Sequence, residues 1–160
     1  MIHRILLAVD DSPAGLAAAH VAIELAVVCR AEVRAVTVLV DGELEAALAG
    51  ISAGRETSEA LRARRGGGQS AVLHHVVELA YVRDVIPETM ALVGEPAPAI
   101  LEEAARYRPD LVVIGRSDRR VTGQPYVGSE VRHVLEFAEQ PVLVVPADGS
   151  ALGAREPPRP

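Results

Sequence analysis

The chain contains no lysine, and all sixteen of its cationic residues are arginine. A P-loop NTPase needs the lysine of its G-x4-G-K-[ST] signature and a Schiff-base enzyme needs a side-chain amine, so both mechanisms are excluded. Aromatic residues are scarce, with no tryptophan, one phenylalanine and three tyrosines. Platforms for base stacking are therefore nearly absent, and a formal net charge of −6 gives no general attraction for nucleic acid or anionic membrane. We expect neither nucleic acid nor membrane as a partner.

Cysteine and long apolar runs are also scarce. The one cysteine, Cys29, excludes an intramolecular disulfide and a cysteine-based metal site, and its apolar helical surroundings favour a buried small side chain. No uncharged run approaches the roughly 20 apolar residues of a membrane span. The apolar run at residues 5–9 is too short for the core of a signal peptide. We expect a soluble, cytoplasmic protein.

Apolar content is high, at 49%, and it is concentrated in short continuous runs. Five such runs predict strands, at residues 5–9, 33–40, 89–93, 111–114 and 141–145. Helix-start signals or helical spacing between the runs predict helices at residues 13–30, 71–82 and 97–107, and a further helix opening at Gly128 and Ser129. Strands that are apolar throughout are buried on both faces, which indicates a parallel sheet covered by helices on each side.

The predicted fold is therefore α/β, a single doubly wound five-stranded parallel sheet in the order 3-2-1-4-5. One domain spans residues 1–146, residues 42–70 give no clear pattern, and residues 147–160 have the composition of a disordered tail. In this strand order the topological switch point lies between strands 1 and 4, and ligands bind beyond the carboxyl ends of the strands there. Asp10 follows strand 1 and Gly115 ends strand 4, so a ligand site is predicted beside them.

Three segments resemble the universal stress proteins: Val9-Asp10-Asp11-Ser12, Gly94-Glu95-Pro96, and the block at residues 110–146. Nucleotide-binding members of that family carry G-x2-G-x9-G-[ST] in the last block. This chain keeps the spacing with Gly115, Gly128 and Ser129, but Asp118 stands in place of the second glycine. The resemblance covers residues 2–146.

The resemblance implies a stress-response regulatory protein that binds an adenine nucleotide, ATP, without fast hydrolysis. Asp10 would hydrogen-bond the ribose or the base edge, and Val38 would meet the adenine. A glycine admits a polyphosphate without a Cβ in the way, and a helix start offers free N–H groups to an anion. The phosphates would be held by the segment that contains Gly115, Arg116, Asp118, Gly128, Ser129 and the Glu130 backbone.

Asp118 bears on whether ATP binds. A carboxylate about 4 Å from a phosphate charge costs roughly 1–4 kcal/mol. Arg116, Arg119 and Arg120 in the same loop oppose that repulsion, and Asp118 could also engage Mg²⁺ carried by the nucleotide. The alternative function is a nucleotide-free stress-response interaction dimer in which the loop from Gly115 to Ser129 is only structural.

Other constellations fit less well. The acidic pair after strand 1 resembles that of receiver domains, which also need a lysine. Residues 115–119 lack the last glycine of a G-x-S-x-G nucleophile elbow. His74 and His75, as helix neighbours, point about 100° apart and cannot share a metal as an i, i+4 pair does. We predict no catalytic residue and no metal site formed by protein side chains.

The last predicted strand lies at an edge of the sheet. An exposed apolar edge promotes pairing with another chain, and family members that resemble this chain commonly dimerise through that strand. We expect a two-fold homodimer that uses Val142 and Val144.

Overall fold

The computed structural model describes residues 1–39, 71–116 and 127–147. Expectations for residues 42–70, for Asp118 and for the tail beyond residue 147 fall outside this part. The elements follow the predicted order: β1 (Arg4–Ala8), α1 (Pro13–Cys29), β2 (Glu32–Leu39), β3 (Glu88–Val93), α4 (Pro96–Tyr107), β4 (Leu111–Gly115), α5 (Ser129–Phe137) and β5 (Val142–Val145). Residues 71–81 are helical as well.

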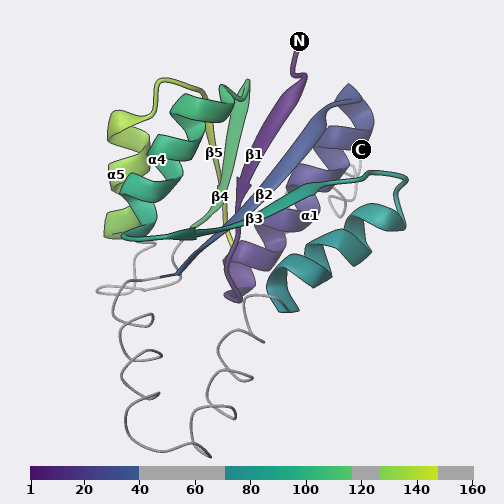
Figure 1. Cartoon of the computed structure of the whole chain (residues 1–160), viewed down its shortest axis with the longest axis horizontal. Coiled ribbons are helices and arrows are strands. Elements are labelled where there is room, and N and C mark those ends of the chain that lie inside the picture. The colour runs from purple at the N-terminus through teal and green to yellow at the C-terminus, as the bar shows by residue number, and fades with distance from the viewer. Residues whose placement is uncertain (40–70, 117–126, 148–160) are drawn as a thin grey trace, which may run out of the picture.

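The five strands form one parallel sheet in the order β3-β2-β1-β4-β5, which confirms the predicted topology. In the central register Leu7 of β1 pairs with Ala35 of β2 and with Val113 of β4. Figure 1 shows α1 and the helix at residues 71–81 on one side of the sheet, with α4 and α5 on the other. All strands run the same way, so the sheet has an amino edge, where strands begin, and a carboxyl edge, where they end.

Two hydrophobic cores explain the continuous apolar strands. Leu7 and Val113 point into the core under α1 and the helix at residues 71–81. Their neighbours Leu6 and Val112 point into the core under α4 and α5. Each central strand therefore buries successive side chains on opposite faces, whereas the edge strand β3 is largely exposed.

Helix α1 begins where the sequence predicts. The Ser12 hydroxyl oxygen accepts a hydrogen bond from the Gly15 N–H at 3.0 Å, and Pro13 occupies the first helical turn. The expectation that Cys29 is buried is wrong: it is half-buried because it lies in the last turn of α1.

A charged cluster joins helix α4 to the amino edge of the sheet. Glu103 of α4 is fully buried, and its carboxylate contacts Arg34 of β2 at 2.6 Å and also Arg106. The same Arg34 pairs with Glu88 of β3 at 2.7 Å and lies 4.0 Å from the centre of the Tyr107 ring. A buried carboxylate is tolerated only when it is paired in this way.

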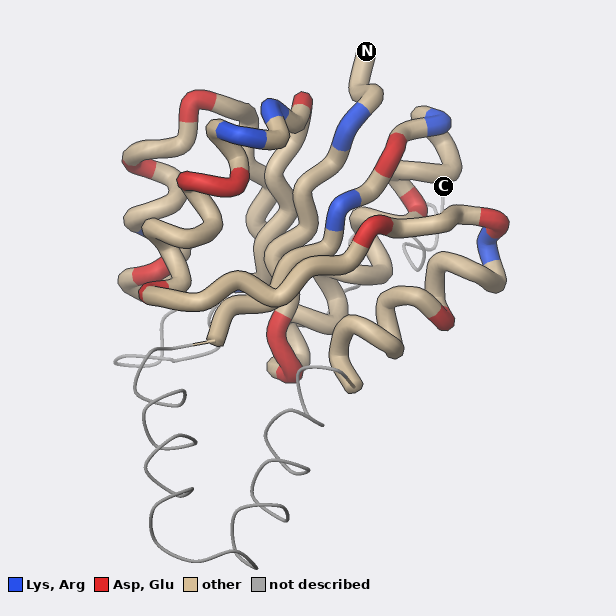
Figure 2. The backbone as a smooth tube through the Cα atoms, viewed as in Figure 1, with Lys and Arg blue, Asp and Glu red and all other residues tan. Residues whose placement is uncertain are grey.

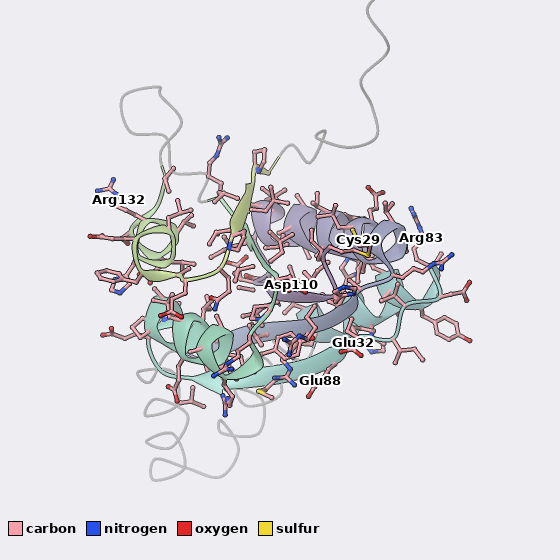
Figure 3. The ribbon with its side chains drawn as sticks, turned by 90° about the horizontal axis from the view of Figure 1, so that it is seen from above. Cys29, Glu32, Arg83, Glu88, Asp110 and Arg132 are labelled. Carbon is pink, nitrogen blue, oxygen red and sulfur yellow. The ribbon has the colours of Figure 1, made fainter. Side chains whose placement is uncertain are left out.

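Asp110, just before β4, fastens the start of β1 at the same edge. Its carboxylate accepts hydrogen bonds from the backbone N–H groups of His3 and Arg4 at 2.7 and 2.9 Å. These bonds favour the ionised form and hold the pKa of Asp110 below its usual range. Figure 3 looks onto the amino edge from above and shows Glu32, Glu88 and Asp110 there.

We predict that Arg34→Met destabilises the protein by roughly 3 kcal/mol, because it leaves the buried Glu103 carboxylate without its partner from β2. This predicted destabilisation is at the low end for a broken buried ion pair, because Arg106 still contacts Glu103. Glu88→Gln is the matched control: the Glu88 side chain is 55% exposed, so its loss should cost below about 1 kcal/mol. Urea unfolding of both variants measures the change in the free energy of unfolding. Equal losses of stability would contradict the role of Arg34 as the essential partner of Glu103.

Candidate functional site

The predicted switch point lies at the carboxyl edge, between β1 and β4. Ala8 pairs with Ile114 at the ends of these two strands, and the chain continues into Asp10 on one side and Gly115 on the other. The starts of α1, α4 and α5 lie along the same edge in Figure 1. Neighbouring strands whose connections leave toward opposite faces form the usual place for a ligand in an open α/β sheet.

Asp10 is exposed and fixed against the first turn of α1. Its Oδ1 atom accepts hydrogen bonds from the Ser12 hydroxyl at 2.5 Å and from the Ser12 backbone N–H at 3.2 Å. The Ser12 oxygen in turn accepts from Gly15. A negative charge at a helix start is stabilised by the helix dipole. Asp10 is therefore held at a defined position while its carboxylate stays open to solvent.

Two glycines make room for close contacts at the first turn of α1, one with the end of β4 and one with Asp10. A Cβ on Gly115 would lie 2.5 Å from the Ala14 carbonyl carbon and 2.6 Å from the Gly15 nitrogen. A Cβ on Gly15 would lie 2.1 Å from Oδ1 of Asp10. The structure thus brings Asp10 and Gly115 together through the first turn of α1. The close packing of Gly115 against α1 requires glycine at this position even without a ligand.

Gly15 was missed by sequence reasoning, although a signal was present. Glycine in a helix costs roughly 0.5–1 kcal/mol relative to alanine, and Gly15 stands among the alanines of α1. Such a costly residue in an otherwise favourable helix indicates a close approach by another part of the chain.

Val38 and Arg116 lie at the same edge of the sheet. Val38, near the end of β2, is half-buried and packs against the core under α4 and α5. The Arg116 backbone N–H donates to the Val145 carbonyl at 2.6 Å, which continues the pairing of β4 with β5 past Gly115. Both residues are therefore placed by strand pairing rather than by a flexible loop.

The start of α5 supplies the remaining predicted residues. Gly128 is its N-cap and is half-buried, while Ser129 and Glu130 are exposed. The Glu130 carboxylate reaches α4, where Oε2 accepts from the Ala97 N–H at 3.3 Å. This side-chain contact ties Glu130 to α4 and not to Asp10 or α1. Asp118 belongs to the part of the chain left undescribed.

The described residues form neither a cluster of metal ligands nor a helix that could span a membrane. Within residues 1–39, 71–116 and 127–147, no group of three or more His, Cys, Asp and Glu side chains could hold a metal ion. His74 lies 3.3 Å from Glu78, one turn along its own helix. The described helices include none that is long and apolar enough to cross a bilayer.

Comparison with known proteins identifies the family. The model of the universal stress protein family matches residues 1–146. A universal stress protein of Methanocaldococcus jannaschii is 34% identical over 142 residues, which cover 89% of this chain and 81% of that protein. The chain belongs to the universal stress protein family.

Solved structures show the same fold. Universal stress protein UspA from Lactobacillus plantarum superposes with a TM-score of 0.71 at 25% identity, covering 90% of this chain and 97% of that one. A universal stress protein family member from Arabidopsis thaliana, solved with AMP bound, gives a TM-score of 0.65 at 18% identity and covers 90% and 91%. The doubly wound sheet is thus shared across distant relatives.

We predict that Gly115→Ala destabilises the fold by about 1–3 kcal/mol, the usual cost of forcing an extra carbon into a packed contact. The added Cβ would meet backbone atoms of Ala14 and Gly15, which cannot rotate away as a side chain can. Ser129→Ala, at the exposed start of α5, is the control and should leave the free energy of unfolding almost unchanged. Unaltered urea stability of Gly115→Ala would show that α1 does not pack this closely.

Proposed function

We propose that this protein is a cytoplasmic stress-response regulator that binds an adenine nucleotide, ATP, beyond the carboxyl ends of β1 and β4. The observation that carries the proposal is the arrangement at the switch point, where the fixed Asp10 carboxylate and Gly115 lie at the start of α1, in a chain of this family. The AMP-bound Arabidopsis relative supports the choice of adenine nucleotide.

Each end of the nucleotide has a partner of suitable chemistry. Asp10, as an exposed acceptor, suits the ribose hydroxyls or the amino edge of the base. Val38 offers an apolar contact to adenine. The N–H groups at the start of α5, at Ser129 and Glu130, suit phosphate oxygens, and Arg116 adds positive charge. Mg²⁺ would enter with ATP, as its phosphate-bound counter-ion.

We propose binding without fast hydrolysis. The P-loop lysine does not exist in this chain, and sequence reasoning identifies no general base beside the expected phosphates. A bound nucleotide would then act as a regulatory ligand that stabilises one state of the protein.

The second candidate function is a nucleotide-free stress-response interaction dimer, and Asp118 favours it. A carboxylate at the position of the family's second glycine would repel a polyphosphate. In that case the segment from Gly115 to Ser129 is structural, and the contact of Gly115 with α1 gives one such structural role.

Isothermal calorimetry with ATP tests the nucleotide proposal. Ser129→Ala should weaken ATP binding by about 1 kcal/mol, roughly fivefold, through loss of one hydrogen bond.

Asp118→Gly should strengthen ATP binding by about 1–3 kcal/mol at low salt. This gain should shrink near 0.5 M salt because exposed charges are screened. Ser12→Ala is not a suitable control, because Ser12 caps α1; Glu136→Gln, exposed at the far end of α5, is suitable.

The calorimetric outcomes separate the candidates. Loss of Mg²⁺-ATP binding in Asp118→Gly would assign Asp118 to the metal ion. Undetectable binding by both the natural protein and Asp118→Gly would establish the nucleotide-free dimer instead. Equal affinity in the natural protein and Ser129→Ala would place the nucleotide away from α5.

Strand β5 supports a homodimer. It is an edge strand that pairs with β4 on one side, and its residues Val142 and Val144 remain half-buried. Unpaired backbone groups flanked by apolar side chains favour pairing with a second strand. We propose a two-fold dimer through β5, in which the same surface of each copy meets its equivalent.

Sedimentation equilibrium at micromolar concentration should give twice the mass of the chain. Val144→Lys should shift the protein to monomers, because it places a charge in the apolar contact at the edge. Thr89→Lys, at an exposed position of the opposite edge strand β3, is a control for added charge and should leave the dimer intact. A natural protein that sediments as a monomer would refute the dimer.

A further inference from the structure

The first turn of α4 contains a single N–H group in need of a partner. Helix starts normally leave several N–H groups unpaired, which makes them attractive to anions. In α4 the residues Pro96 and Pro98 have no N–H at all, and the Ala99 N–H donates to the Glu95 carbonyl at 3.0 Å. The Ala97 N–H remains, and Ala97 is only 1% exposed.

Glu130 satisfies that last donor from the neighbouring helix. Its Oε2 atom accepts from the Ala97 N–H at 3.3 Å. The carboxylate thereby lies at the positive end of the α4 dipole, where a negative charge is stabilised. Glu95, the N-cap of α4, makes no side-chain capping bond of its own. The start of α4 is closed by its two prolines together with Glu130.

The start of α5 is arranged in the opposite way. Its N-cap is Gly128, which has no side chain that could accept a hydrogen bond. The Arg132 N–H is already paired with the Gly128 carbonyl at 3.0 Å, so the preceding N–H groups, at residues 129–131, are those that a ligand could reach. Helices α4 and α5 run side by side from the same edge of the sheet in Figure 1. Two adjacent helix starts thus differ in what they offer to an anion.

We propose that Glu130 is a positioning residue that directs a bound phosphate to α5. It does so in two ways. First, the Glu130 carboxylate accepts from the Ala97 N–H, so the start of α4 has no free donor for a phosphate. Second, this bond holds the negative charge of Glu130 away from the open N–H groups at the start of its own helix, α5. The proposal rests on the proposed nucleotide site, and it adds a role for the Glu130 side chain, whereas the family resemblance involves only its backbone.

Inorganic phosphate, followed by NMR of the backbone amides of the full chain, tests the direction of binding. In the natural protein, phosphate should shift the amides of residues 129–131 and leave Ala97 unmoved. In Glu130→Ala the Ala97 amide should exchange faster with solvent and should now respond to phosphate. Glu130→Gln keeps an acceptor oxygen and should restore the slow exchange. An Ala97 amide that behaves alike in all three proteins would overturn the proposal.

ATP affinity provides the second readout. Glu130→Ala should bind ATP about threefold to tenfold more weakly even though it removes a negative charge, because the start of α5 loses its link to α4. Glu130→Gln should bind ATP as tightly as the natural protein or more tightly. The control Glu136→Gln should have the ATP affinity of the natural protein. Equal tightening by Glu130→Ala and Glu130→Gln would show a simple charge effect and refute positioning. If the natural protein binds no ATP, the proposed function fails, and the phosphate experiment still decides the role of Glu130.

Discussion

The contact between the end of β4 and the first turn of α1 is the constraint on which the carboxyl edge depends. Glycine at position 115 lets the first turn of α1 lie against the strand, and glycine at position 15 leaves room for Asp10 beside it. Any side chain at either position would meet backbone atoms or the Asp10 carboxylate at a distance that cannot be tolerated. Gly115, the first glycine of the family pattern, is therefore required for packing against α1 whether or not a ligand binds. This packing sets the geometry of the proposed site.

Charged side chains are arranged differently at the two edges of the sheet. At the amino edge, Arg34 of β2 pairs with Glu103 of α4. Asp110, just before β4, accepts hydrogen bonds from the backbone at the start of β1. At the carboxyl edge, Asp10 and Ser129 remain open to solvent. Figure 2 shows the middle of the sheet as uncharged, with Arg, Asp and Glu toward the strand ends and on the helices. Paired charges stabilise the fold at the amino edge, whereas exposed polar groups lie at the carboxyl edge.

Helices α1, α4 and α5 all begin at the carboxyl edge, and their first N–H groups have different partners. In α1 the Ser12 hydroxyl accepts from the Gly15 N–H, and in α4 two prolines lack the N–H and Glu130 from another helix accepts from Ala97. In α5, glycine at the N-cap leaves the first N–H groups available. Unpaired N–H groups and a helix dipole favour an anion, so this difference supports the proposed phosphate position at the start of α5 over the start of α4.

The sequence by itself determined the sheet order, the cap of α1 and the position of Asp10 and Gly115 at the carboxyl edge, because these follow from local signals. Continuous apolar runs predict buried parallel strands, and Ser12-Pro13 starts a helix in almost any surroundings. Only the tertiary structure decided the roles of Gly15, Gly115 and Glu130. Gly115 contacts Ala14 and Gly15 across about 100 positions of sequence, Glu130 reaches Ala97 on another helix, and the turn that precedes α1 brings Asp10 against Gly15. Distances of that kind arise from the packing of whole elements, which no local pattern contains.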